Sequence, residues 1–145
     1  MMAYSQGVSG NGPGPQGICP TGWHIPTDNE WKCLEMNLGM TQAQADQAIG
    51  WRGADEGGKL KETGMTHWSA PNAGATNSSE FTALPGYYVA GGSNFSNPPG
   101  THAYFWSATE ESGNSQTRTL YNLYAQIGRA AQLKTNGYSV RCIKD

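Results

Sequence analysis

The feature that most constrains this chain is a pair of dense, cysteine-bearing segments near its two ends. The first is Cys19-Pro-Thr-Gly-Trp-His-Ile-Pro-Thr-Asp-Asn-Glu-Trp31, and the second is Gly137-Tyr-Ser-Val-Arg-Cys-Ile-Lys-Asp145. A bridge between Cys19 and Cys142 would close almost the whole chain into one loop, which is worth about 4–5 kcal/mol in the chain-entropy model. A protein with such a bridge would mature in an oxidising compartment.

The composition is typical of one loop-rich domain. The 145 residues are 37% hydrophobic and 14% charged, with 20 glycines, 5 tryptophans and 7 tyrosines. Large rings would therefore pin short strands and turns. A net charge of −2 gives no electrostatic reason to expect nucleic acid as a partner, and no apolar run approaches the length of a membrane span. No signal peptide is visible after Met1.

Residues 1–16 read as an irregular lead rich in Gly, Pro and Ser, and residues 17–145 as a single domain. The first predicted helix starts at Thr27, which forms a T-x-x-E capping box with Glu30, and Gly39 stops it. Its buried face would consist of Trp31, Leu34 and Leu38. Cys33 falls in the middle of this helix and is the third, unpaired cysteine, interpreted as a buried and inert thiol.

A second short helix is predicted directly after the first. Thr41 and Gln44 form a T-x-x-Q box, and Gly50 ends the segment. In between, Ala45, Ala48 and Ile49 would share one face.

The rest of the chain is predicted to form ordered loops and short strands. Residues 51–100 have no regular period, yet they carry too many rings for a disordered linker. Residues 104–109 are strand-like, and apolar and polar side chains alternate along residues 118–129. Leu120 and Ile127 would face opposite ways on one strand, so a hairpin or bulge near residues 122–125 is expected. Residues 138–143 read as a last strand with Tyr138, Val140 and Cys142 on one face.

Five segments, in order, resemble the Fibrobacter succinogenes major paralogous domain. They are 17–31, 50–61, 74–86 in two parts, 104–110 and 137–145. The resemblance implies an α+β, C-type lectin-like fold: two short helices, a small mixed or antiparallel sheet and a long ordered loop region, with the first and last cysteines paired. Family members usually have a strand-forming segment before Gly17, and here only Met1 to Gln16 precede it, which predicts a shortened or absent terminal strand. Five tryptophans are expected in the core: Trp23, Trp31, Trp51, Trp68 and Trp106.

A second resemblance is to variable proteins of diversity-generating retroelements, which use this fold and concentrate variation near the C-terminus. Arg118, Leu120, Ile127, Arg129 and Lys134 look like framework in the family pattern. The interleaved residues would be the ligand-binding set: Ser115, Thr117, Thr119, Tyr121, Leu123, Tyr124, Gly128, Ala130, Ala131 and Leu133. Tyr121 and Tyr124 are the expected anchors, because a ring offers a wide contact area at low entropy cost. The alternative interpretation is that these residues are ordinary exposed positions.

Catalytic chemistry is poorly supported by the sequence. The formylglycine-generating enzymes share the broader fold and use paired cysteines at the active site, but here two cysteines look structural and Cys33 stands alone. His24, His67 and His102 do not lie at metal-ligand spacing, and His24 is expected to pack or hydrogen-bond beside the first helix. Asp55 and Glu56 would cap or pair with Lys59 or Lys61 rather than act as an acid/base pair.

Calcium-dependent sugar binding also lacks its motifs. The chain has no Glu-Pro-Asn, Gln-Pro-Asp or Trp-Asn-Asp triplet. Five residues carry oxygen donors at spacings that fit no calcium loop: Asn77, Glu80, Glu110, Glu111 and Asn114. A structural calcium ion is left as an open alternative, and no other cofactor is expected.

The sequence thus predicts non-catalytic recognition of a protein or surface glycan through residues of about 115–133, in a domain that is secreted or on a cell or virion surface. Membrane insertion is not expected. Two alternatives remain: a structural module of a larger surface protein, and an oxidase of the formylglycine-generating kind.

Overall fold

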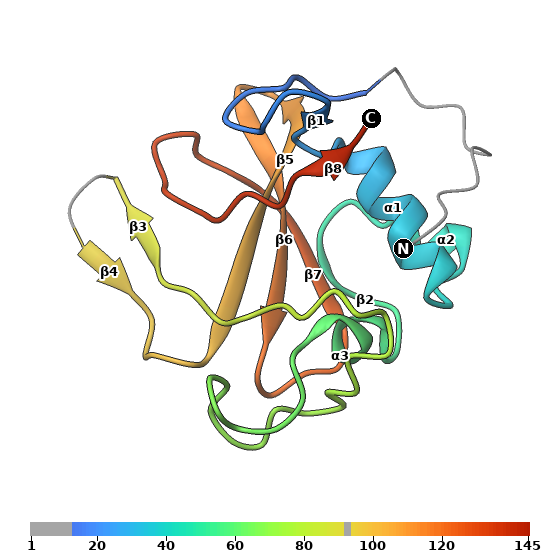
Figure 1. Cartoon of the computed structure of the whole chain (residues 1–145), viewed down its shortest axis with the longest axis vertical. Helices are drawn as coiled ribbons and strands as arrows, with labels where there is room; N and C mark the ends of the chain where they lie inside the picture. Colours follow the sequence, from blue (N-terminus) through green and yellow to red (C-terminus); the bar gives the residue numbers. More distant parts are fainter. Residues whose placement is uncertain (1–12, 92–93) are drawn as a thin grey trace.

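The computed structural model, which describes residues 13–91 and 94–145, has an α+β architecture built on a four-stranded antiparallel sheet (Figure 1). The strand order is β2-β7-β6-β5, formed by Gly50–Arg52, Ile127–Gln132, Asn114–Tyr121 and His102–Glu111. Two further antiparallel pairs are β1 (Trp23–His24) with β8 (Ile143–Lys144) and β3 (Tyr88–Ala90) with β4 (Asn94–Ser96). The helices are α1 (Asp28–Asn37), α2 (Gln42–Ala45) and α3 (Glu56–Leu60).

The first helix begins and ends where its capping signals predict. The Thr27 hydroxyl accepts from the Glu30 amide, and the Glu30 carboxylate accepts from the Thr27 amide at 2.8 Å. Gly39 follows the C-cap with a φ of 121°, a left-handed conformation that favours glycine. Trp31 and Leu34 are buried, as their spacing predicts.

The second helix is shorter than predicted. Its capping box is present, but α2 ends at Ala45, and the expected shared face is wrong because Ala48 and Ile49 are exposed. The Arg52 guanidinium donates to the Ala45 carbonyl at 2.8 Å, and Gly50 already pairs with β7. Tertiary contacts therefore replace the next helical turn.

The hairpin predicted between Leu120 and Ile127 is confirmed. β6 ends at Tyr121, β7 starts at Ile127, and Leu120 and Ile127 are both buried. The preceding hairpin, from β5 to β6, turns through Ser112 and Gly113, which have φ of 50° and 85°. Two consecutive residues with positive φ are typical of the tight turns that join antiparallel strands.

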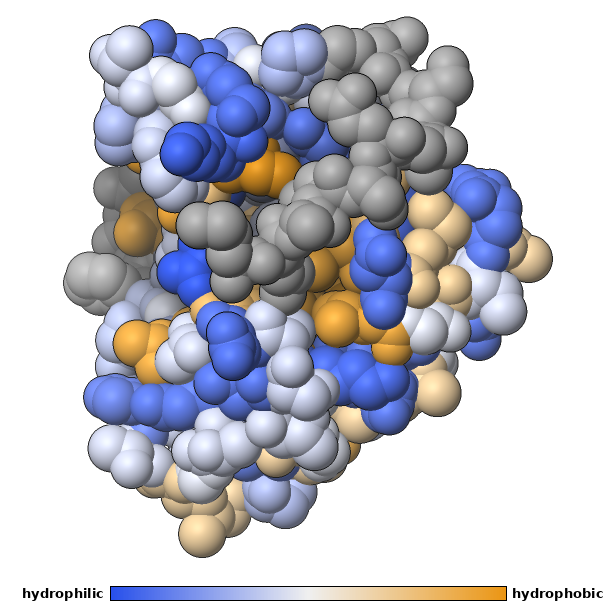
Figure 2. All heavy atoms as spheres, turned by 45° about the vertical axis from the view of Figure 1, so that its right-hand side comes forward, coloured by the Kyte–Doolittle hydropathy of each residue, from blue (hydrophilic) through white to orange (hydrophobic). Residues whose placement is uncertain are grey.

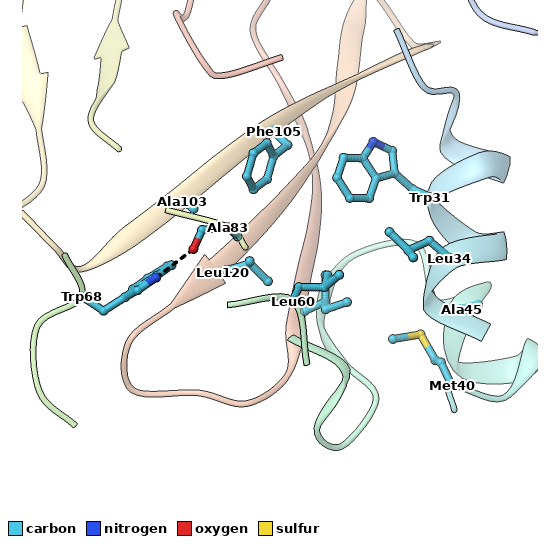
Figure 3. Close-up of a cluster of buried hydrophobic side chains, with 11 residues drawn as sticks. Trp31, Leu34, Met40, Ala45, Leu60, Trp68, Ala83, Ala103, Phe105 and Leu120 are labelled. Atoms are coloured by element: carbon cyan, nitrogen blue, oxygen red, sulfur yellow. Dashed lines mark hydrogen bonds between the residues drawn. The ribbon is translucent and has the colours of Figure 1, made fainter. Parts of the chain in front are cut away.

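One face of the main sheet packs against α1 to form the core (Figure 3). Ala103, Phe105, Leu120 and Ile127 project from the sheet toward Trp31, whose ring centroid lies 5.8 Å from that of Phe105. The remaining members come from the helices and the loops: Leu34, Met40, Ala45, Leu60, Trp68 and Ala83. The Trp68 indole also donates to the Ala83 carbonyl at 2.9 Å.

The long region between β2 and β3 is ordered by side chains that bind backbone carbonyls. Asn72 donates to the carbonyls of Glu62 and Gly64, and Asn122 donates to those of Ser69 and Ala70. Such bonds satisfy backbone groups that no helix or strand pairs. The region also contains α3, which the sequence did not predict.

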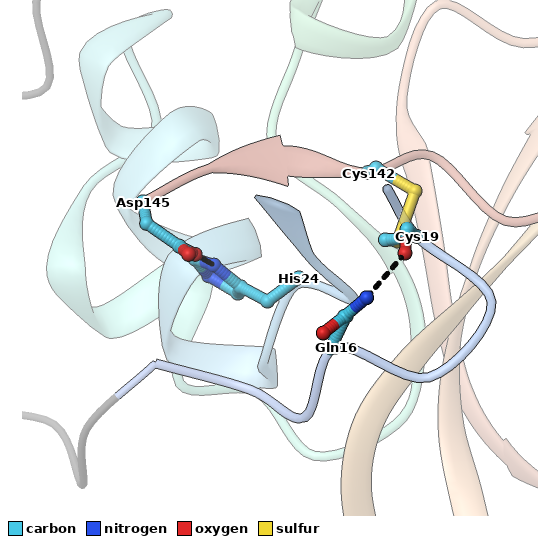
Figure 4. Close-up of a disulfide and its surroundings, with 5 residues drawn as sticks. All are labelled: Gln16, Cys19, His24, Cys142 and Asp145. Carbon is cyan, nitrogen blue, oxygen red and sulfur yellow. Dashed lines mark hydrogen bonds and ion pairs between the residues drawn. A yellow bond between two sulfur atoms is a disulfide. The ribbon is translucent and has the colours of Figure 1, made fainter. Parts of the chain in front are cut away.

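The two ends of the described chain are joined by a disulfide and by strand pairing (Figure 4). The bridge expected between Cys19 and Cys142 is present, and His24 of β1 pairs with Ile143 of β8. The predicted last strand over residues 138–143 is wrong in extent, because β8 contains only Ile143 and Lys144. Ser139 forms a single parallel bridge with Phe105 instead.

Residues 13–16 of the predicted lead belong to no helix or strand, and residues 1–12, to which most of the prediction of a shortened or absent terminal strand applies, lie outside the described residues. The longest described helix, α1, has 10 residues, and none in the described part has the length and apolar character of a bilayer crossing. On the face shown in Figure 2, hydrophobic residues are exposed in patches between hydrophilic ones.

Candidate binding face

The face of the main sheet that points away from the core carries most of the predicted ligand-binding residues. Successive side chains of β6 point to opposite sides of the sheet, so Thr117, Thr119 and Tyr121 share one side. Ser115 follows the same alternation. Across the ladder Thr117 pairs with Ala130 and Thr119 with Gly128, which puts these two β7 residues on that side. Ala131 pairs with the buried Gln116, on the opposite side of the sheet.

These candidates differ in accessibility. Leu123 and Tyr124 in the β6–β7 turn are exposed, Tyr124 to 42%, and so is Leu133 beyond the end of β7. Partly buried positions make up a second group: Ser115, Thr119, Tyr121, Ala130 and Ala131. Thr117 and Gly128 are buried, and the Thr117 hydroxyl donates to the Ala130 carbonyl at 2.9 Å. A ligand would therefore reach the turn and the exposed ends of the strands more readily than the middle.

Four rings come together beside the turn, and we call them the aromatic patch: Trp51, His102, Tyr121 and Tyr124. The Tyr121 ring stacks on His102 with centroids 4.2 Å apart and an interplanar angle of 17°. Its other neighbours are Trp51, at 6.1 Å, and Tyr124, at 5.2 Å. Burial lowers the pKa of His102, so its imidazole is uncharged at neutral pH.

The prediction that all five tryptophans lie in the core is wrong for two of them. Trp31 and Trp68 are buried and Trp106 is partly buried, but Trp51 is 37% exposed and Trp23 is 39% exposed. Trp51 was missed as a surface residue because β2 is an edge strand of only three residues, whose outer side nothing in the local sequence identifies.

Gly128 makes room for the Trp51 ring. A Cβ at this position would lie 3.3 Å from Cζ3 of Trp51 and 3.2 Å from Cβ of Thr119, closer than ordinary contact. The indole therefore lies against the β7 backbone. The absence of a side chain at Gly128 thus contributes to the shape of the aromatic patch.

Buried charges on the core side hold the sheet to α1. Arg118 of β6 pairs with Glu35 and, at 2.8 Å, with Asp28, while Arg52 reaches Glu35 at 2.9 Å and Arg129 reaches Asp28 at 2.7 Å. Burial is the largest influence on Asp28 and opposes its ionisation, but Arg118 and Arg129 outweigh it and lower its pKa. The framework roles expected for Arg118 and Arg129 have this physical basis.

Three polar residues that the sequence singles out make structural contacts: His24, Asp55 and Glu56. His24 packs beside α1 as predicted, with its ring nitrogens 2.7 Å from Glu30 and 2.6 Å from Asp145. Asp55 pairs with Lys59 at 2.7 Å, and the Glu56 carboxylate accepts from the amides of Ala54 and Asp55. Cys33 is free and half-buried, and burial raises its pKa.

The oxygen donors considered for calcium do not converge. Asn77 binds the amide of Thr82, Glu110 pairs with Lys134, and Glu111 accepts from Gln116. Among residues 13–91 and 94–145, no three acidic, histidine or cysteine side chains are grouped so that they could hold a metal ion.

A cavity of about 250 Å³ lies beside the disulfide, between α1 and β8. It is lined by Pro26, Trp31, Leu34, Glu80, Phe81, Arg141, Cys142 and Ile143. The Arg141 guanidinium lies 4.4 Å from the centre of the Phe81 ring and donates to the Phe81 carbonyl. The lining of this cavity includes none of the predicted binding residues.

Comparison with known proteins identifies the family. No curated protein and no solved structure matches the chain. The family model described as the Fibrobacter succinogenes major domain, in contrast, matches residues 4–144, which is nearly the whole sequence and includes both cysteines of the bridge. The chain therefore belongs to the Fibrobacter succinogenes major domain family.

Proposed function

We propose that this domain is a non-catalytic recognition module that presents the face around residues 115–133 to a protein or surface glycan. The observation that carries the proposal is the aromatic patch. Trp51 and Tyr124, from distant parts of the chain, contact one another and stay exposed. Exposed, clustered aromatic rings are common anchors of binding surfaces.

The framework behind this face supports recognition without refolding. Arg118, Arg129 and their acidic partners fix β6 and β7 to α1, and the disulfide joins the chain ends. A pre-ordered backbone loses less conformational entropy when a ligand binds. Side chains on the outer face can then differ between proteins while the buried framework is kept.

In this proposal the fold is C-type lectin-like. The chain ends meet in β1 and β8, two helices follow the first strand, and a long loop region separates β2 from β5. These features support the proposed fold, in which the candidate binding residues lie on β6, on β7 and in the segments next to them.

The proposal extends to the origin of the variation, a diversity-generating retroelement. Neighbouring DNA that encodes a reverse transcriptase and a near-copy of the 3′ coding end would support it. A long multidomain reading frame with neither element would favour a structural module of a larger surface protein.

The proposed location is extracellular or on a cell or virion surface, because a disulfide persists in oxidising compartments. Non-reducing mass spectrometry of the protein from its native cells tests this location. A peptide pair joined through Cys19 and Cys142 supports it, and free thiols at both positions contradict it.

The binding proposal is tested with immobilised panels of defined glycans and of purified surface proteins. Trp51→Ala and Tyr124→Ala should weaken any bound probe about tenfold or more, as expected for anchor residues. Trp23→Ala is the matched control, because this tryptophan is equally exposed but lies in β1. A probe that loses as much affinity with Trp23→Ala as with Trp51→Ala would contradict the proposal, as would a panel without any binder.

A further inference from the structure

Lys61 is a fully buried lysine directly beneath the turn that carries Tyr124. It follows the last residue of α3, and its exposure is 0%. Its Nζ donates to three backbone carbonyls: Ala73 at 2.8 Å, Tyr124 at 2.9 Å and Tyr121 at 3.0 Å. Trp68 lies on another side, with its ring centre 5.5 Å from Nζ.

The number of donors matches the number of acceptors. An ammonium group has three N–H bonds and no acceptor, so three carbonyls satisfy it completely. Two of these carbonyls, of Tyr121 and Tyr124, mark the beginning and the middle of the β6–β7 turn. In the described part of the chain the amine forms no ion pair, so its hydrogen-bond partners are backbone carbonyls.

The turn is also attached to its surroundings by main-chain contacts. The Gly58 amide of α3 donates to the Ala125 carbonyl at 2.8 Å, and the Ala73 amide donates to the Asn122 carbonyl at 2.7 Å. A Cβ on Gly57 would collide with the Gln126 carbonyl, so α3 and the turn are in close contact. Lys61 differs from these contacts because one group connects both tyrosine carbonyls.

We propose that Lys61 is the positioning residue of the binding face: its ammonium fixes the backbone of Tyr121 and Tyr124, and thereby where their rings stand. Its importance for ligand binding rests on the function proposed above, whereas its effect on the turn does not.

The contact depends on the protonation state of Lys61. Burial lowers the pKa of Lys61 to about 8, well below the usual value of about 10.4 for lysine. A neutral amine has only two N–H bonds, and its lone pair repels a carbonyl oxygen. One of the three carbonyls is therefore released as the pH rises through about 8.

Neighbouring titratable groups do not provide an equivalent transition. On α3, Glu56 binds backbone amides and Lys59 pairs with Asp55. After Lys61, Glu62 pairs with His67. On the sheet, His102 stacks on Tyr121, and its pKa is lowered by burial, so it stays neutral above pH 7.

Loss of the Lys61 proton should loosen the turn, whereas the contribution of Lys61 to the free energy of unfolding of the whole domain should rise. The pKa of Lys61 is lower in the folded than in the unfolded state, so the unfolded state binds more protons between about pH 8 and about pH 10. The contribution of Lys61 to the free energy of unfolding thus increases over that interval. If the turn loosens while the free energy of unfolding of the domain does not fall, the change is local and differs from general alkaline unfolding.

The test uses amide hydrogen exchange of the full chain, read by NMR as protection factors for residues 121–126 at about pH 6.5 to about 9.5. The variant is Lys61→Met, which keeps the length of the side chain and removes the donors. Lys59→Met is the matched control, because Lys59 also binds a carbonyl, that of Leu38 at 2.7 Å, away from the turn. We expect Lys61→Met to lower protection in the turn about tenfold or more relative to Lys59→Met, the value of a hydrogen bond to a charged group.

The wild-type pH series provides the second measurement, which stands even if Lys61→Met does not fold. Turn protection should fall across a one-proton transition near pH 8. Unchanged turn protection in Lys61→Met, or no transition in the wild type, would overturn the inference. If the turn loosens but a glycan or protein from the panels binds as before, the inference about Lys61 stands and the proposed function fails.

Discussion

The rings of Trp51 and Tyr124 meet edge to face, with centroids 4.8 Å apart and an interplanar angle of 73°. One ring comes from the edge strand β2 and the other from the turn after β6, so the contact connects β2 with the β6–β7 turn. Edge-to-face pairs of this kind contribute about 0.5–1.5 kcal/mol beyond the burial of their area. Because both side chains are more than one-third exposed, a change in either residue should alter binding more than folding.

Replacing Tyr124 with alanine should separate binding from stability. The side chain is 42% exposed, so its loss removes less buried surface than the loss of a core residue, and the melting temperature should fall by only a few degrees. Affinity for a probe found in the panels should fall about tenfold or more. Thermal unfolding and equilibrium binding measure the two effects, and a large fall in melting temperature would show that the ring belongs to the core.

Substituting Gly128 with valine should push the Trp51 indole away from β7. Even a Cβ would lie within 3.3 Å of both Trp51 and Thr119, and overpacking of this kind typically costs about 1–3 kcal/mol. The Trp51 indole NMR signal should shift. Gly86→Val is the control, because its Cβ would meet only the Ser139 hydroxyl, at 3.8 Å. Equal shifts of the Trp51 signal in both variants would argue against this packing.

Removing the guanidinium of Arg118 should destabilise the domain strongly. Arg118→Met leaves Glu35 and Asp28 buried with fewer partners, and breaking a buried ion pair typically costs about 3–5 kcal/mol. Urea unfolding measures the loss. Arg141→Met, at an exposed arginine over the Phe81 ring, should cost far less, and similar losses in the two variants would contradict a framework role for Arg118.

Reduction of the disulfide should lower the free energy of unfolding. The bridged cysteines are separated by 123 residues, and closing so long a loop is worth about 4–5 kcal/mol in the chain-entropy model. The double variant Cys19→Ala, Cys142→Ala should show the same loss without added reductant. A double variant as stable as the oxidised protein would mean that β1 and β8 hold the ends together unaided.

The pairing of His24 should make stability depend on pH near neutrality. Burial is the largest influence and opposes protonation, but the hydrogen bonds that the His24 ring donates to the Asp145 and Glu30 carboxylates outweigh it and raise the pKa of His24 above its usual value. The stabilisation is therefore complete below about pH 6.5 and is lost as the pH rises through the folded-state pKa. Chemical denaturation across this range should give a steeper decline for the wild type than for His24→Gln. Parallel profiles would exclude the pairing as the cause.

Local signals in the sequence predicted the elements that local interactions determine. The capping box of Thr27 and Glu30 needs only residues within one turn, and α1 forms where it indicates. The opposite parity of Leu120 and Ile127 required a reversal, and the hairpin is there. The second helix was predicted too long, because Arg52 of the following strand β2 takes the Ala45 carbonyl.

The sequence alone determined the family, the bridged cysteines and the alternation that divides the last strands into a buried and an exposed side. The family and the cysteine pairing follow from the resemblance of whole segments, whereas the alternation is encoded by short-range periodicity. Only the tertiary structure decided that Glu35 and Lys61 are buried charges and that Trp51 belongs to the exposed face. The partners of these three residues lie far away in the chain, and a charged or aromatic side chain carries no local sign of which distant group will bind it.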